Sequence, residues 1–212
     1  MTAQPAPVIT NVDWKVRWRP TPPQMVRLLV GLAIFGGGEA LLIEAHLGNT
    51  PWTVLSQGIG KRTNLSVDVA TFFVGLAVLA CWAIVRERPG LGTVCNAIVI
   101  PIAMRFSLEA LPTPHAMWAR SLVMIGGVLA ISFGCGLYIS AHLGPGPRDG
   151  LMTGIHTRTK IPIARVRLAI EAAVFVVGWA LGGVIGVGTV CFALFVGPLV
   201  ARFLKLFGWS AA

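Results

Sequence analysis

The stretch AHLGNTPWTVLSQGIGKRTNLS at residues 45–66 returns 96 positions later as AHLGPGPRDGLMTGIHTRTKIP at residues 141–162. A second pair of stretches keeps the same offset, because GLGTVCNA at 90–97 matches GVGTVCFA at 186–193. The chain of 212 residues is therefore a tandem duplication. Internal repeats in an apolar chain are typical of transporters that are built from two similar halves.

The composition places both copies in a membrane. Hydrophobic residues make up 55% of the chain and charged residues only 12%, which is too apolar for a soluble domain of this size. A membrane-spanning helix needs about 20 largely apolar residues, and three stretches in each copy come close to this length. They are 26–45, 67–86 and 92–109 in the first copy, and 122–141, 165–184 and 189–207 in the second. These long apolar stretches, without alternating polar residues, favour helices over a membrane β-barrel.

The distribution of Lys and Arg orients these helices, because short cytoplasmic segments of membrane proteins retain an excess of both residues. With a cytoplasmic N-terminus, all but four of the 17 Lys and Arg residues lie on the cytoplasmic side; the four are Lys61, Arg62, Arg105 and Arg120. Each copy crosses the membrane three times, so the second copy begins on the side where the first one ends. The sequence thus predicts an all-α membrane protein whose six transmembrane helices form an inverted 3+3 repeat, with both termini in the cytoplasm.

We expect four regions along the chain: a basic, aromatic N-terminal arm at 1–25, the first repeat at 26–109, a linker at 110–121 and the second repeat at 122–212. The net charge of +9 is explained by the positive cytoplasmic side and by contact with anionic lipid headgroups. The lipid bilayer is therefore the expected partner, and nucleic acid is not. The sequence has no His/Cys spacing suited to zinc and no recognisable set of catalytic side chains. We expect no metal, no cofactor and no enzyme activity.

Each copy carries a short polar segment after its first span. In the first copy, Asn49 or Thr50 can cap a helix, Pro51 suits its first position, and residues 52–62 extend it. Such a helix is about 18 Å long, which is too short to cross a membrane. We favour an amphipathic helix that lies in the membrane interface. The alternative is a pair of re-entrant half-helices that dip from opposite faces, with positive N-termini near the midplane, where many transporters hold anionic groups.

Two glutamates, Glu39 and Glu171, fall inside the predicted spans. An ionisable side chain in hydrocarbon costs roughly 2.5–3.5 kcal/mol even on insertion scales, and it is a functional-site hypothesis by default. Glu171 lies one helical turn from Arg167, so a local ion pair and a functional role are both open for it. Glu39 follows the glycine run 36–38 and has no cation nearby on its own helix. We predict that Glu39 faces a cavity or titrates with protons.

Five further polar residues complete the candidate site for substrate or protons: His46, His142, Arg62, Arg158 and Gln57. The paired histidines titrate near neutral pH and are able to sense a proton gradient, although we favour a role at the ends of their helices. The paired arginines are able to bind substrate anions, although we favour lipid phosphates as their partners. Gln57 lies on the surface of the first short segment.

The first copy also carries a family resemblance. Its residues 48–58, 62–66 and 86–96 read GNTPWTVLSQG, RTNLS and RERPGLGTVCN. This pattern resembles the YczE-type family of small bacterial membrane proteins, which is grouped with YitT-like proteins. The resemblance implies a polytopic helical fold in the bacterial cytoplasmic (inner) membrane. The second copy departs from the pattern because it lacks the Arg-x-Arg-Pro sequence and Asn96.

These observations favour a small-solute transporter or permease with its binding site at the repeat interface, coupled to protons through Glu39 or Glu171. The alternative is a non-transporting scaffold or regulatory protein that binds a partner through its glycine-rich helix faces. A homodimer is also compatible with the sequence, because six small helices leave a thin wall around any cavity.

Overall fold

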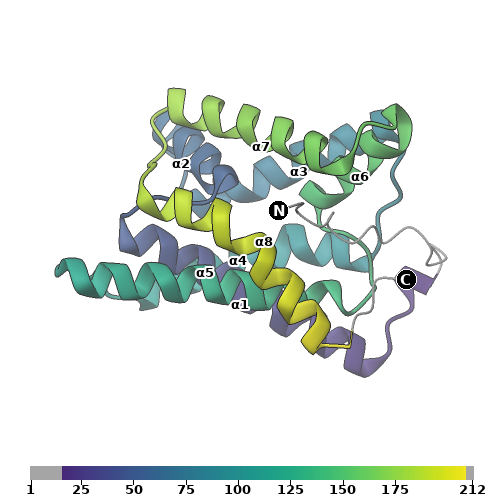
Figure 1. The fold of residues 1–212 in the computed structure, drawn as a ribbon, viewed down its shortest axis with the longest axis horizontal. Coiled ribbons are helices and arrows are strands. Elements are labelled where there is room, and N and C mark those ends of the chain that lie inside the picture. Colours follow the sequence, from purple (N-terminus) through teal and green to yellow (C-terminus); the bar gives the residue numbers. More distant parts are fainter. Residues whose placement is uncertain (1–15, 209–212) are drawn as a thin grey trace.

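The computed structural model describes residues 16–208, and all regular structure in this part of the chain is helical (Figure 1). A short 3-10 helix, Val16–Trp18, precedes eight α-helices. They are α1 (Pro22–Ala45), α2 (Pro51–Thr63), α3 (Val67–Val85), α4 (Leu91–Ala110), α5 (Met117–Ile139), α6 (Pro147–Thr159), α7 (Ile163–Ala180) and α8 (Val187–Leu206). Most of the predicted N-terminal arm, residues 1–15, lies outside the described residues.

The two copies form the same four helices in the same order. The bounds of α2 and α6 differ by the repeat offset at both ends, and so do those of α4 and α8. The backbone also repeats at the end of the first helix of each copy. His46 and His142 have φ values of 51° and 58°, and Gly48 and Gly144 have φ values of 111° and 113°. The duplication seen in the sequence is therefore preserved in the backbone.

Five helices are long and apolar enough to cross a membrane: α1, α3, α4, α5 and α8. Helix α7, which covers most of the predicted span 165–184, is not among them, because its 18 residues include Arg165, Arg167 and Glu171. Five of the six predicted spans are therefore confirmed as apolar helices of sufficient length. The remaining helix, α7, differs from them by its charged residues.

Helices α1 and α5 cross each other closely in antiparallel directions. A Cβ atom built on Gly31 would lie 2.6 Å from the backbone nitrogen of Tyr138, and one on Gly38 would lie 2.8 Å from that of Ile131. Residue numbers thus rise along α1 while they fall along α5. Glycines permit this approach of two backbones, which is the usual way for helices to associate in lipid.

The remaining helices interlock the two copies. Helix α4 packs on α1 and helix α8 packs on α5, both within one copy, whereas α2 packs on α7 and α3 packs on α6, between copies. Figure 1 shows α7 along one edge of the molecule, α1 and α5 along the opposite edge, and the short helices α2 and α6 at opposite ends. The two short helices therefore enter the molecule from different ends.

The repeated sequence motifs bind the copies to each other. The backbone N–H of Gly92 donates to the carbonyl of Leu143 at 2.8 Å, and that of Gly188 donates to the carbonyl of Leu47 at 2.7 Å. Each AHLG loop is thus bonded to the first turn of the last helix of the other copy. This exchange explains why the two motifs recur together.

Candidate functional site

Both short helices are buried at their N-terminal ends and exposed at their C-terminal ends. In α2, Thr50 and Thr53 are 1% and 0% exposed, whereas Arg62 is exposed. In α6, Pro147 is buried and Arg158 is exposed. An amphipathic helix in the membrane interface is expected to have one exposed face along its whole length. In both short helices burial instead falls along the helix axis, from the N-terminal to the C-terminal end.

The N-terminal ends of the two short helices meet inside the protein. The guanidinium carbon of Arg148 on α6 lies 5.1 Å from the ring centroid of Trp52 on α2, which is the equivalent residue of the first copy. Arg148 Nη1 also donates to Oε1 of Glu39 on α1 at 3.3 Å. Glu39 is 0% exposed, and the Arg148 side chain is 23% exposed. Glu39 therefore has a cation partner that was not predicted from the sequence, and this partner comes from the other copy.

The first turn of α6 also connects to the second predicted glutamate. Tyr138 Oη donates to Asp149 Oδ2 at 2.7 Å, and Asp149 interacts electrostatically with Arg167. Arg167 Nε in turn donates to Glu171 Oε1 at 2.9 Å. The local ion pair anticipated for Glu171 is thus present. A row of charged residues leads from the buried Glu39 through α6 to the partly exposed Glu171.

Gln57 links α2 to the second copy. Its Oε1 accepts hydrogen bonds from Asn49 Nδ2 and from the backbone N–H of Val184, each at 3.1 Å. Thr50 is the N-cap of α2, as one of the two predicted alternatives stated, and its Oγ1 accepts from the N–H of Thr53 at 3.2 Å. These bonds hold the N-terminal end of α2 in the interior.

The predicted histidine pair lies at opposite ends of the antiparallel α1–α5 pair. Arg120, in the first turns of α5, donates to the carbonyl of His46 at 2.8 Å. His142 follows the other end of α5, where burial first and then the positive charge of Arg27 lower its pKa below the usual 6.5. The carbonyls before the two histidines are bonded by side chains from the other copy. Gln24 Nε2 donates to Ala141 O at 3.1 Å, and Arg120 Nε donates to Ala45 O at 2.8 Å.

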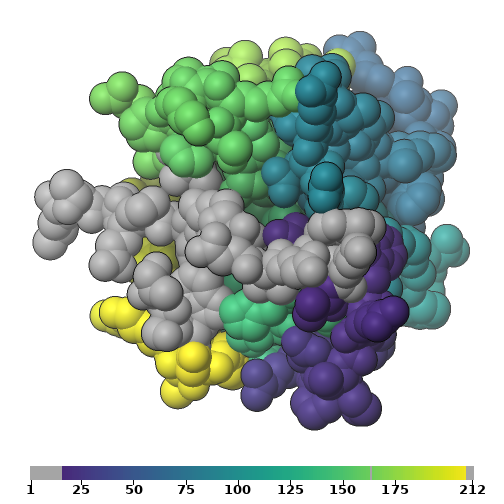
Figure 2. Space-filling view, turned by 90° about the vertical axis from the view of Figure 1, so that its right-hand side faces the viewer, coloured from purple at the N-terminus to yellow at the C-terminus, as the bar shows by residue number. Residues whose placement is uncertain are grey.

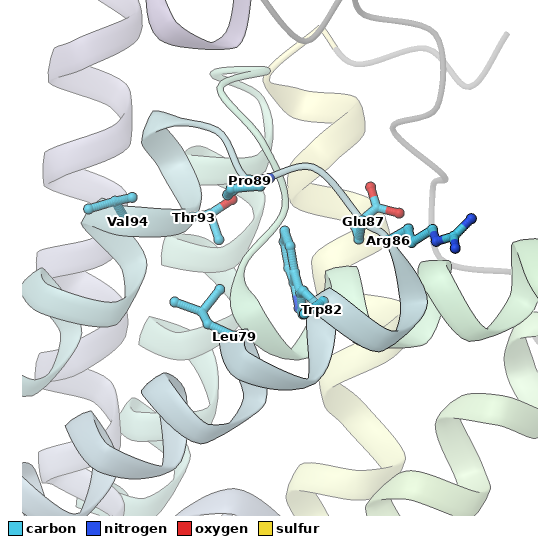
Figure 3. Close-up of a pocket in the computed structure, with 8 residues that line it drawn as sticks. Leu79, Trp82, Arg86, Glu87, Pro89, Thr93 and Val94 are labelled. Carbon is cyan, nitrogen blue, oxygen red and sulfur yellow. The ribbon is translucent and has the colours of Figure 1, made fainter.

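A pocket of about 420 Å³ lies between the end of α3 and the start of α4 (Figure 3). Its lining residues are Leu79, Trp82, Ala83, Arg86, Glu87, Pro89, Thr93 and Val94. Two of them hold the segment that leads into α6, because Trp82 Nε1 donates to Pro147 O at 2.9 Å and Thr93 Oγ1 donates to Pro145 O at 2.8 Å. Burial raises the pKa of Glu87, against the opposing effects of Arg17 and of a backbone hydrogen bond from Arg88. Neither Glu39 nor Glu171 lines this pocket.

The helices and the buried charges define a polytopic helical membrane protein. Residues 23–205 match the model of a family of unknown function, DUF6198, and the chain belongs to this family. It is 40% identical over 201 residues to an uncharacterized protein of Haemophilus influenzae, with 94% of this chain and 92% of the relative covered. It is 32% identical over 175 residues to the uncharacterized membrane protein YczE of Bacillus subtilis, with 82% and 81% covered. The resemblance to the YczE-type family is thus confirmed; no solved structure matches the chain.

Proposed function

We propose that this membrane protein is a small-solute transporter or permease of the bacterial inner membrane, built as an inverted 3+3 repeat with both termini in the cytoplasm. Three observations support the inversion: α1 and α5 are antiparallel, His46 and His142 lie at opposite ends of this pair, and the hydrogen bonds between the copies are reciprocal. In this proposal α7 is the sixth span. Its charges gather near one end, where Arg165 and Arg167 reach the membrane surface.

The orientation is supported by the end of the molecule that Figure 2 views. The start of α1, the link between α6 and α7 and the end of α8 lie together there. These segments carry positive residues of the predicted cytoplasmic side, among them Arg27, Lys160 and Lys205. An excess of positive charge marks the cytoplasmic face of a bacterial membrane protein.

The buried Glu39–Arg148 ion pair, at the meeting point of the two short helices, is the observation that carries the proposed function. In the proposed topology α2 and α6 are re-entrant half-helices from opposite sides of the membrane. Transporters with such helices bind their solutes where the half-helices end, near the midplane. An ion pair at that depth is costly, because Glu39 is fully and Arg148 largely removed from water, and a cost of this kind is typical of a functional site.

Proton coupling through Glu39 is part of the proposal. A carboxylate that exchanges a cationic partner for a proton couples proton movement to the binding of a solute. Glu39 suits this role better than Glu171, because its side chain is 0% exposed whereas that of Glu171 is 26% exposed. The row of charges through Asp149 and Arg167 offers a route from Glu39 towards Glu171.

The packing of the glycines disfavours a scaffold that binds its partner through glycine-rich helix faces. Gly31, Gly38, Gly127 and Gly134 contact the facing helix of the α1–α5 pair within the chain itself. Gly178 and Gly183 likewise contact the backbone of α2. Most of the glycine surface is therefore used to hold the two copies together, and transport explains the buried charges better.

Reconstitution into liposomes tests the proposal. The purified full-length chain is placed in vesicles that contain a pH-sensitive dye, a proton gradient is imposed, and a collection of small metabolites is screened for solute-dependent proton flux. We expect at least one solute to give flux with the wild-type chain. Glu39→Gln should abolish that flux, because the substitution removes the charge that binds solute or proton while it keeps the shape of the side chain.

Glu109→Gln is the matched control. It also removes a carboxylate that is paired with an arginine, but the Arg105–Glu109 pair is exposed, with side-chain exposures of 61% and 59%. This variant should keep full flux. Full flux in the Glu39→Gln vesicles, or no flux with any solute in the wild-type vesicles, would contradict the proposed function.

A further inference from the structure

Glu39 has one carboxylate oxygen without a partner. Arg148 Nη1 reaches Oε1 at 3.3 Å, whereas Oε2 is buried and has no hydrogen-bond partner in the described part of the chain. Buried polar atoms are nearly always hydrogen-bonded, and each exception requires an explanation. A carboxylate oxygen of an ionised glutamate only accepts hydrogen bonds, so the missing partner is a donor or a cation.

Asn49 shows the same deficit at the N-terminal end of α2. The backbone N–H of Val184 can only donate, so it fixes Oε1 of Gln57 as the acceptor. Oε1 also accepts from Asn49, which fixes the amide nitrogen of Asn49 towards Gln57. Asn49 Oδ1 is then left buried and without a partner on a residue that is 1% exposed. A second buried acceptor in this region therefore lacks a donor.

The partial positive charges at the N-terminal ends of α2 and α6 are already partly compensated by side chains of the protein itself. The first turn of α2 is capped by Thr50, whose Oγ1 accepts from the backbone of Thr53. The first turn of α6 contains its own carboxylate, Asp149. Both features reduce the attraction of these helix ends for an anionic solute. Glu39 Oε2 and Asn49 Oδ1 only accept, so each lacks a donor, whereas the buried Ser56 Oγ of α2, also without a partner, is able to donate or to accept.

Arg148 is only loosely bound to Glu39. An arginine that is committed to a carboxylate usually donates two parallel hydrogen bonds, whereas the pair has one at 3.3 Å. The guanidinium also lies over the ring of Trp52, at 5.1 Å, and its side chain is 23% exposed. The face of an aromatic ring attracts a cation, so the buried ring of Trp52, which is 5% exposed, holds the guanidinium independently of Glu39.

We propose that Glu39 is the docking carboxylate for a small cationic solute with N–H donors, such as a guanidinium or primary ammonium group, and that Arg148 occupies its place in the empty protein. The inference rests on the proposed function and names the class of its solute. When the solute binds, it donates to both oxygens of Glu39, and Arg148 gives up its hydrogen bond to Glu39 while its guanidinium stays over the ring of Trp52. Arg148 thus keeps the buried carboxylate neutralised between two rounds of binding, and it competes with the solute.

Binding of guanidinium, measured against its neutral near-isostere urea, tests this inference. The detergent-solubilised full-length chain is titrated with guanidinium chloride or urea at non-denaturing millimolar concentrations, with sodium chloride keeping the ionic strength constant. Isothermal titration calorimetry should show saturable binding of guanidinium and none of urea. Glu39→Gln should abolish the binding, whereas Glu109→Gln should leave it unchanged.

Arg148→Gln gives the result that separates competition from a merely structural ion pair. Removal of the competitor should tighten guanidinium binding by about tenfold, because the free form of Glu39 becomes fully populated. Guanidinium should also raise the thermal midpoint of the Arg148→Gln variant more than that of the wild-type chain, because it neutralises the unpaired Glu39. The second measurement shows that the variant is folded and reports on the same site.

The outcomes separate this inference from the proposed function. Absence of guanidinium binding to both the wild-type and the Arg148→Gln chains overturns the inference, and so does binding of urea that depends on Glu39. Neither result affects the transport proposal, which is judged by flux with the whole solute collection. Binding of guanidinium as expected, without flux of any solute in liposomes, supports the cation site and overturns transport.

Discussion

The short helices α2 and α6 have the same length and the same place in their copies, but they differ in chemistry. The first turn of α2 is neutral and contains Trp52 and Thr53, whereas the equivalent residues of α6 are Arg148 and Asp149. Their N-caps differ as well, because Thr50 bonds the backbone of α2 and Gly146 has no side chain to do so. The duplication therefore supplied a symmetric frame, and later divergence gave the short helix of the second copy the charge of Arg148, which pairs with Glu39 of the first copy.

The packing of the two short helices differs in a related way. Trp82 on α3 and Gly178 on α7 are equivalent residues, and so are Val54 on α2 and Gly150 on α6. Trp82 contacts Gly150, whereas Gly178 contacts the backbone at Val54. The larger side chain thus lies on the long helix in one junction and on the short helix in the other, and in both junctions a glycine of the partner helix allows the two helices to approach closely.

The largest effect is expected where this approach brings two backbones together. A Cβ atom on Gly178 would lie 2.5 Å from the backbone nitrogen of Leu55. Gly178→Leu should destabilise the protein by about 3 kcal/mol or more, because the backbone of α2 cannot move aside as a side chain can. The thermal stability of the detergent-solubilised protein, followed by size-exclusion chromatography after heating, measures the loss.

Gly126→Leu is the control for Gly178→Leu. Gly126 lies in the apolar helix α5, and no atom lies within 4 Å of a Cβ built on it. This variant should keep the wild-type stability. Equal stability of the two leucine variants would show that α2 is not held against α7 in the way described.

A double-mutant cycle should sharpen the contrast between the two junctions. Trp82→Ala is expected to cost about 3–5 kcal/mol, through loss of a buried indole, and Gly150→Val about 1–3 kcal/mol, because the new side chain meets the ring of Trp82. The double variant places the larger side chain on the short helix, as in the other junction. Its cost should fall short of the sum by about 1 kcal/mol or more, because each change relieves the other.

The matching cycle at the other junction should show no such relief. The neighbours of a Cβ atom on Gly178 are backbone atoms of Val54 and Leu55, so trimming the side chain of Val54 creates no room for it. The costs of Gly178→Ala and Val54→Ala should add within about 0.5 kcal/mol. Unfolding in a denaturant series gives all of these free energies. A coupling of similar size in both cycles would remove the distinction between the junctions.

The features that the sequence predicts well are local or periodic. The Arg167–Glu171 pair follows from a spacing of four residues on one helix, and the N-cap at Thr50 follows from the residues beside it. The end of α7 differs from the prediction, although its cause is also local. This helix ends at Ala180, earlier than the predicted 184, because Gly182 turns the chain with φ of 95°. Each of these outcomes depends on a few neighbouring residues.

The partner of Glu39 could not be predicted in this way. Arg148 lies on a helix of the other copy, and the contact exists only because α6 enters the molecule beside α1. The available signal was the difference between the copies, since arginine on α6 replaces tryptophan on α2. In a duplicated chain, a charged residue at a position that is apolar in the other copy therefore indicates a site more directly than the shared residues do.

The smallest expected effect concerns the equivalent histidines at the ends of α1 and α5. Burial and then the positive charge of Arg27 lower the pKa of His142 below 6.5. The residue equivalent to Arg27 in the other copy is Val123. A histidine with a lowered pKa binds fewer protons in the folded state than in the unfolded state. Its contribution to stability is thus fully present above pH 6.5, the unfolded-state pKa, and is lost as the pH falls below 6.5 and through the lower pKa of the folded state.

Replacement of His142 should therefore flatten the fall in stability below pH 6.5. Thermal midpoints of the wild-type, His142→Gln and His46→Gln chains between mildly acidic and neutral pH measure the effect, which should be smaller than that of either packing change. The slope should be reduced in His142→Gln, and His46→Gln is the matched substitution at the other helix end. An unchanged slope in His142→Gln would contradict the assignment of this pH dependence to His142.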